Sequence, residues 1–321
     1  MSAYKEYGGY LEMERGRGGL YHDNAVYLNS ARNALKYVIR AYDIKRIAVP
    51  YFTCPVMWQA IEEEGCAMNF YEIDKNMKPK LDHIKKDEFI LCNNYFGIQS
   101  REIQQLAGRY PNLIVDNAQA FFSHHCGTAS IYSPRKFFGL PDGGIAVTVN
   151  RNQRPLEIDV SYQRCEHLMK RHDLGASAAY ADFCEADKQL DSAPVKAMSN
   201  LTKNLMCSID YNYVKKRRRQ NFKLMHQSLA SLNALHIDLT DIDIPMAYPL
   251  LIESDNLKAK LIGKKVYVAT YWPQLETICP DGSDTLYLKN NLVPLPIDQR
   301  YGCDDISSIL NIVHDLLAGV Q

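Results

Sequence analysis

One stretch of the sequence, residues 113–149, holds a carboxylate and an amine in an arrangement that could do chemistry. The apolar run Leu113–Val115 ends in Asp116, and Lys136 follows on a loop that closes with Gly143-Gly144. A lysine amine can form an imine with the aldehyde of pyridoxal 5′-phosphate (PLP), and a carboxylate can pair with the protonated nitrogen of its pyridine ring. Because that pairing keeps the ring an electron sink, the stretch predicts a PLP site with Lys136 and Asp116 as catalytic residues.

Each of these residues alone has an ordinary structural explanation. An apolar run that ends in Asp commonly caps a turn or a helix, and a lysine beside an arginine is usually part of a solvated loop. The combination is more specific, because Asp-x-x-Gln, Ser-x-x-Lys and Gly-Gly follow one another in order within this stretch.

The motifs resemble those of the DegT/DnrJ/StrS aminotransferases, PLP enzymes of fold type I that mostly aminate nucleotide-linked keto-sugars. Asp116–Gln119 is similar to the family's Asp-Ala-Ala-Gln, and Ser133, Lys136 and Asp142–Gly144 are similar to its lysine loop. The resemblance spans most of the chain and is strongest over residues 28–149. Three further segments carry it, namely Asn29–Leu35, Val49–Thr53 and Tyr95–Gly97.

Several departures from the family pattern bear on the substrate. The segment between Asp116 and Lys136 is shorter than in the family, and Ala31-Arg32 stands where the family has Gly-Thr. Residues 151–200 do not follow the pattern of the sugar enzymes. These differences favour the cofactor assignment over the sugar assignment.

A set of further residues is expected to hold the cofactor. A helix that begins after Ser30 offers free backbone N–H groups to a phosphate, and Arg32 could either grip that phosphate or point into solvent. The resemblance implies that Gln119 hydrogen-bonds the phenolic oxygen of the ring; the alternative is an amide that satisfies the next loop. Phe52 or Cys54 is expected against the ring face, with core packing as the competing explanation. The cofactor-binding candidates are Lys136, Asp116, Gln119, Ser133, Ser30, Ala31, Arg32, Phe52, Cys54 and Asn94.

Composition narrows the class of protein. The chain has 321 residues with 37 basic and 37 acidic side chains, so its net charge is zero and gives no general attraction to nucleic acid or to an anionic membrane. Nine cysteines without a Cys-x-x-Cys pair predict reduced thiols, and no metal site is expected. The first ten residues lack a signal-peptide pattern and no apolar run could span a membrane, so a cytoplasmic protein is expected.

Strand-like and helix-like patterns alternate along the chain and predict an α/β fold with a mostly parallel sheet. Residues 1–234 are expected to form the PLP-binding large domain, including a helical region over 151–230, and residues 235–321 a smaller α+β domain. In such sheets ligands bind at the carboxyl ends of the strands, where Pro50, Asn94 and Asp116 are expected to lie. The expected strands are 46–50, 67–73, 88–92, 113–115, 145–149, 245–252 and 266–270, and the expected helices are 31–41, 56–64, 102–110, 201–232 and 304–317.

Two segments offer candidates for substrate contacts. A helix over about 161–171 would place Arg164, His167 and Arg171 on one face, where basic side chains could pair with a nucleotide diphosphate; the alternative is a solvated helix face. Tyr271 could reach back to the cleft, whereas Trp272 is equally well explained by core packing. The basic run Lys215–Arg219 is better explained by a solvated face or subunit contacts than by nucleic-acid binding.

The expected activity is aminotransfer. By resemblance, glutamate would donate the amino group, a keto-sugar-type acceptor, nucleotide-linked in the family, would receive it, and the enzyme would be a homodimer. Another PLP reaction, such as elimination or dehydration, is an alternative on the same scaffold. A non-catalytic PLP-fold binding protein is a second alternative, although the presence of Lys136 counts against it.

Overall fold

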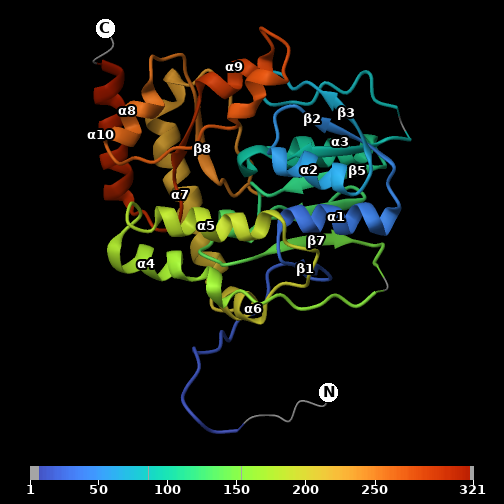
Figure 1. Cartoon of the computed structure of the whole chain (residues 1–321). Coiled ribbons are helices and arrows are strands. Elements are labelled where there is room, and N and C mark those ends of the chain that lie inside the picture. The colour runs from blue at the N-terminus through green and yellow to red at the C-terminus, as the bar shows by residue number, and fades with distance from the viewer. Residues whose placement is uncertain (1–6, 86, 153, 319–321) are drawn as a thin grey trace.

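A computed structural model describes residues 7–85, 87–152 and 154–318. Its main sheet has seven strands in the order β1-β7-β6-β5-β4-β2-β3 (Figure 1). Neighbouring strands from β6 to β3 run parallel, whereas β7 is antiparallel to both β6 and β1. The strands are β1 Val26–Leu28, β2 Arg46–Pro50, β3 Ala67–Tyr71, β4 Phe89–Asn93, β5 Leu113–Asn117, β6 Ala129–Tyr132 and β7 Gly144–Thr148. The predicted mostly parallel α/β sheet is confirmed.

Helices cover both faces of this sheet. The α-helices are α1 Ala31–Tyr42, α2 Pro55–Glu63, α3 Ser100–Arg109, α4 Glu166–Leu174, α5 Tyr180–Asp191, α6 Asn200–Met206, α7 Tyr211–Leu229, α8 Leu257–Gly263, α9 Asp284–Asn291 and α10 Cys303–Ala318. Short 3₁₀ turns are η1 Tyr95–Gly97, η2 Pro134–Lys136, η3 Tyr162–Arg164, η4 Ala230–Leu232 and η5 Pro273–Thr277.

Burial on both faces explains why the central strands read as apolar runs. In β2, Ile47 and Val49 pack in the same core as α1 and α2, whereas Ala48 lies in the core that holds Phe222 of α7. Successive residues of a strand point to opposite faces, so each face has its own core. The sheet is therefore a rigid, doubly covered platform for whatever its strand ends carry.

The helix α1 begins where the sequence predicts. The Ser30 hydroxyl accepts a hydrogen bond from the Asn33 backbone N–H (3.1 Å), as expected of an N-cap. Its apolar side, including Leu35 and Val38, is fully buried against the sheet.

The C-terminal part of the chain builds a second, antiparallel pair of strands, β8 Ala247–Leu251 and β9 Leu292–Pro296. Helix α10 packs against α7 and α8, and Figure 1 shows these three helices side by side. The strand expected over 266–270 is wrong. Val266 and Val268 are buried, but none of the strands in the described part of the chain pairs with them. Their burial therefore reflects side-chain packing without a ladder.

The single helix expected over 201–232 is also wrong. It divides into α6 and α7, because Asp210 starts a new helix by accepting the Tyr213 backbone N–H (2.9 Å). The Cys207 carbonyl between them accepts the Gly18 N–H (2.8 Å) instead of continuing a helix. Local capping therefore outweighs helix propensity in this segment.

Among the described residues, no helix combines the length and the apolar character that crossing a bilayer requires.

Candidate active site

The carboxyl ends of β5 and β4 meet at one edge of the sheet because the two strands pair in parallel, with Asn93 opposite Asp116. A small cleft lies there, with about 220 Å³ of space that is partly open to solvent. It is lined by Thr53, Cys54, Asn93, Asn94, Asp116, Ala118, Gln119, Lys136 and Trp272. The structure thus brings together five of the predicted residues: Lys136, Asp116, Gln119, Asn94 and Cys54.

Asp116 is a buried acid, 6% exposed. One of its oxygens accepts the Ala118 backbone N–H (2.8 Å). Burial raises the pKa of Asp116, and the positive charge of Lys136 and the Ala118 N–H oppose that rise in part. A buried carboxylate of this kind is well suited to a cationic N–H donor such as a protonated pyridine nitrogen.

Two amide side chains beside Asp116 present acceptors without partners. Asn93 donates to the Thr53 hydroxyl (2.8 Å), and Asn94 donates to Asn117 Oδ1 (3.0 Å). Their own Oδ1 atoms are buried, and no described residue donates to either. An unsatisfied buried acceptor costs free energy, so these two atoms mark a place where a ligand with donor groups fits.

Gln119 has a defined orientation. Its Oε1 accepts the Phe96 backbone N–H (2.9 Å), which leaves the amide nitrogen as the end that can donate to a ligand. A donor at this position is what the family resemblance implies for the phenolic oxygen of PLP. The buried acid, the amide donor and the lysine together fit the polar groups of that cofactor.

Lys136 ends the short turn η2, and its backbone N–H donates to the Ser133 carbonyl (3.3 Å). Its side chain is exposed in the single chain, and none of the described residues hydrogen-bonds to its amine. Lys136 is therefore available for a covalent bond to a ligand in the cleft.

The glycines after Lys136 have a structural role. Gly143 has φ +137°, and a Cβ added to Gly144 would lie 2.0 Å from the Ser30 carbonyl oxygen. Only glycine permits this approach of the lysine loop to the start of α1.

Other predicted cofactor residues do not line the cleft. The hydroxyl of Ser30 is used as the N-cap of α1, Ser133 precedes η2, and Phe52 is buried in the core against Tyr95. Core packing is thus the explanation for Phe52, whereas Cys54 faces the cleft. Ala31, the first residue of α1, is half-buried and does not line the cleft either.

Arg32 has an ion-pair partner that the sequence did not predict. It is only 8% exposed and pairs with Asp191 at the end of α5 (2.8 Å), so its guanidinium does not point into solvent. It also donates to the Asp191 backbone carbonyl. The two terminal nitrogens of Arg32 thus donate to Leu190 and Asp191, whereas its buried Nε has no acceptor among the described residues.

The substrate candidates lie differently from the predicted helix face, and their role in substrate binding stays a prediction. The helix begins at Glu166, so Arg164 lies in η3 before it and pairs with Asp159 (2.9 Å). His167 is buried against Phe183, and Arg171 is exposed. These three residues do not form one basic helix face, and none of them lines the cleft.

Trp272 lines the cleft, whereas its predicted neighbour Tyr271 packs against Phe96 (ring centroids 5.7 Å apart). For Trp272 the sequence left a place at the cleft and core packing both open, and the structure places it in the cleft lining. The Thr270–Pro273 segment carried the signal, but sequence spacing alone could not decide which of two adjacent aromatic rings turns inward.

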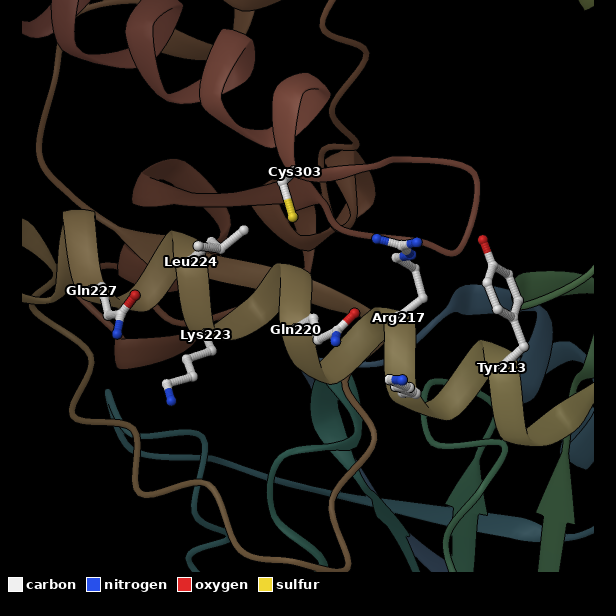
Figure 2. A pocket seen from close by; sticks show the side chains of 8 residues that line it. Tyr213, Arg217, Gln220, Lys223, Leu224, Gln227 and Cys303 are labelled. Carbon is white, nitrogen blue, oxygen red and sulfur yellow. The ribbon is translucent and has the colours of Figure 1, made fainter.

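The basic run Lys215–Arg219 is dispersed around α7. Arg218 is buried, and Arg219 donates to the backbone carbonyls of Thr240, Asp241 and Asp243. Lys216 and Arg217 line an open groove between α7 and the start of α10, and Figure 2 shows Arg217 there. The run therefore makes no continuous basic surface.

No family model matches the sequence, and no curated protein is significantly similar to it. Many solved structures share its fold. The aminotransferase TlmJ from Streptoalloteichus hindustanus has a TM-score of 0.65 at 17% identity, covering 92% of this chain and 86% of that one. A DegT DnrJ EryC1 StrS aminotransferase from Brucella abortus has a TM-score of 0.63 at 15% identity, with 92% and 86% covered.

DesV from S. venezuelae, solved with a ketimine intermediate, has a TM-score of 0.64 at 17% identity, with 92% and 85% covered. The likeness extends over nearly the whole chain and includes an aminotransferase that carries the name of the resembling family. The chain therefore has the fold of these aminotransferases, the α/β fold type I that its motifs predict.

Proposed function

We propose that this protein is a PLP-dependent aminotransferase. The observation that carries the proposal is the buried Asp116 carboxylate in the same cleft as an available lysine amine, that of Lys136. The fold shared with known aminotransferases supports it. The order of the Asp116, Lys136 and Gly143-Gly144 motifs agrees with the same reaction class.

When bound, PLP supplies an aldehyde that takes up an amino group and a ring that delocalises negative charge. Asp116 would hold a proton at the ring nitrogen, because a buried carboxylate is stabilised by a cationic partner. Gln119 would donate to the phenolic oxygen and orient the ring. The Lys136 amine would bind the aldehyde in the resting enzyme and then move a proton at the substrate carbon.

On the basis of the family resemblance, we propose that glutamate donates the amino group and that a keto-sugar-type, nucleotide-linked acceptor receives it. Both substrates and the cofactor are anionic, yet Lys136 is the only cation among the described residues that line the cleft. Arg32 and Arg164 are already paired with Asp191 and Asp159. Further cationic groups would come from a second copy of the chain, so we propose a homodimer with the site at its interface.

Reduction of the PLP-loaded protein with borohydride, followed by peptide mapping, tests the assignment. The phosphopyridoxyl group should be found on Lys136, and Lys136→Ala should remain unlabelled. Label on any other lysine would refute the role of Lys136. A protein that binds no PLP would refute the proposed function as a whole.

Glutamate distinguishes transfer from the alternative PLP reactions. In an aminotransferase, glutamate alone converts the bound cofactor to its pyridoxamine form and releases 2-oxoglutarate. An elimination or dehydration enzyme would leave glutamate unconverted, because glutamate carries no leaving group on its β-carbon, and would retain the aldehyde form. Nucleotide-linked keto-sugars then serve as the acceptor panel. If only simple keto acids accept the amino group, the aminotransferase assignment holds and the proposed sugar acceptor is refuted.

A further inference from the structure

The most buried cation among the described residues belongs to the basic run of α7. Arg218 is 1% exposed, although its neighbours Arg217 and Arg219 reach the surface. No carboxylate of the described residues lies within ion-pair distance of it, although the charge of Asp298 favours its protonated form. Its guanidinium instead donates to backbone carbonyls and to one amide, so its hydrogen bonds tie together segments that are distant in sequence.

One of those segments is the lysine loop. Arg218 Nη2 donates to the carbonyl of Phe137 (3.4 Å), the residue that follows Lys136, and its guanidinium lies over the Phe137 ring, 4.5 Å from the ring centroid. Gln299 donates to the same carbonyl (2.7 Å) and accepts from Arg218 Nε (2.9 Å). Phe137 is thus held from two sides.

A second segment leads to Gln119, which also lines the cleft. Arg218 Nη1 donates to the Met246 carbonyl (2.9 Å), and the Met246 N–H donates to the Phe96 carbonyl (2.8 Å). The Phe96 N–H in turn donates to Gln119 Oε1 (2.9 Å). A continuous series of hydrogen bonds therefore runs from the residue beside Lys136 to Gln119.

We propose, on the basis of the proposed function, that Arg218 is a positioning residue that holds Lys136 and Gln119 at a fixed separation, with Gln299 as the second member of the clamp. Neither residue lines the cleft, so the effect passes through backbone groups. A misplacement of about 1 Å in a catalytic group costs roughly a hundredfold in rate, which makes such a clamp consequential.

The adjacent Arg217 is a matched control. It lies on the same helix and carries the same charge, but it faces the open groove (Figure 2). Arg218→Met and Arg217→Met therefore remove equal charge from a buried and a half-buried position. Arg218→Lys keeps the charge and loses the planar fork of donors. Gln299→Leu removes a single donor to the Phe137 carbonyl, and it replaces Arg218→Met as the test variant if Arg218→Met does not fold.

Two measurements on the full chain decide the matter. In the cofactor-free protein the amides of Phe137 and Phe138 donate to the Pro134 carbonyl. Hydrogen exchange should show that these two amides exchange about tenfold faster in Arg218→Met, the factor that loss of one hydrogen bond corresponds to. Amides of β4 should keep their protection. In the PLP-loaded protein, the rate at which borohydride fixes the phosphopyridoxyl group on Lys136 should fall by a similar factor in Arg218→Met. The rate for Arg218→Lys should be intermediate, and that for Arg217→Met should be unchanged.

A merely structural role predicts a different pattern, in which exchange rises evenly across the sheet and labelling falls only with the folded fraction. That pattern, or an Arg218→Met protein that matches Arg217→Met in both measurements, overturns the clamp. If the unaltered protein is not labelled at Lys136, the proposed function fails, and the exchange measurement still decides whether Arg218 holds the loop.

Discussion

The carboxylate of Asp142 accepts two hydrogen bonds from Ser199, one from its backbone N–H (2.9 Å) and one from its hydroxyl (2.8 Å). The Thr202 hydroxyl donates to the same carboxylate. Asp142 thus satisfies the N-terminus of α6. The acidic residue of the Asp142–Gly144 motif has a structural role, and it anchors the end of the loop that carries Lys136.

Asp142→Ala should lower the free energy of unfolding by about 3 kcal/mol, because it leaves several buried donors without an acceptor. Urea unfolding of the cofactor-free protein measures this. Asp173→Ala, at an exposed position near the end of α4, should change stability by less than about 0.5 kcal/mol. Equal effects of the two substitutions would contradict the anchoring role.

Gly144→Ala should disrupt the contact between the lysine loop and α1, because the new Cβ would lie 2.0 Å from the Ser30 carbonyl oxygen. We expect an insoluble or strongly destabilised protein by thermal unfolding. Gly108 is the control, since it lies in α3 with no heavy atom within 4 Å of an added Cβ. Gly108→Ala should stabilise the chain by up to about 1 kcal/mol; a tolerated Gly144→Ala would refute the close approach.

Asp116→Asn should separate stability from cofactor binding. Burial raises the pKa of Asp116 above its usual value, so the stability that its protonated form contributes is present at low pH. That contribution is lost as the pH rises through the raised pKa. At pH 7 the cofactor-free Asn variant should therefore melt above the unaltered protein, with a weaker dependence of stability on acidic pH.

The same Asp116→Asn variant should retain PLP poorly, because the ring nitrogen loses its anionic partner. Dialysis followed by an absorbance measurement of the retained cofactor checks this. A variant that is less stable than the unaltered protein, yet holds PLP normally, would contradict both parts.

Arg164→Ala should act on stability and leave substrate binding unchanged. The buried pair with Asp159 (2.9 Å) is broken by the substitution, at a cost of about 3 kcal/mol. Kinetics with the accepted donor and acceptor should show an unaltered KM for the folded enzyme. A raised KM with normal thermal stability would instead restore Arg164 as a substrate contact.

Trp272→Ala should weaken PLP binding up to about tenfold, since an aromatic stacking contact contributes roughly 0.5–1.5 kcal/mol. Trp272 is the only aromatic residue among the described residues that line the cleft. Trp58, the other tryptophan of the chain, lies on α2 and packs against Phe70 of β3 (ring centroids 5.4 Å apart). In absorbance titrations Trp58→Ala should bind PLP normally, and matching affinities for the two variants would exclude stacking by Trp272.

The sequence predicted those features that local rules determine. The strand that ends in Asp116, the Ser30 cap and the strand at 46–50 all follow from apolar periodicity and capping. The meeting of Asp116 with Asn94 at one edge followed from parallel pairing. The division into domains at residue 234 stays a prediction.

Features that depend on tertiary partners were not accessible in the same way. Whether Arg32 meets solvent, a phosphate or Asp191 depends on where α5 ends in space, which no local pattern encodes. Val266 and Val268 have the composition of a strand but find no strand beside them. The turn of Trp272 into the cleft likewise depends on a neighbour distant in sequence, Phe52 (ring centroids 5.2 Å apart).

The dispersal of Lys215–Arg219 around α7 also changes what a protease encounters. Five consecutive basic residues are a preferred substrate for trypsin in an extended chain, but in the folded protein Arg218 is enclosed and its helix is packed against α10. Cleavage after Arg218 requires α7 to unwind, so the rate of cleavage is proportional to the fraction of molecules in which this helix is locally unfolded. The rate of that single cut thus gives a direct reading of how often the junction between the lysine loop and the C-terminal strands comes apart.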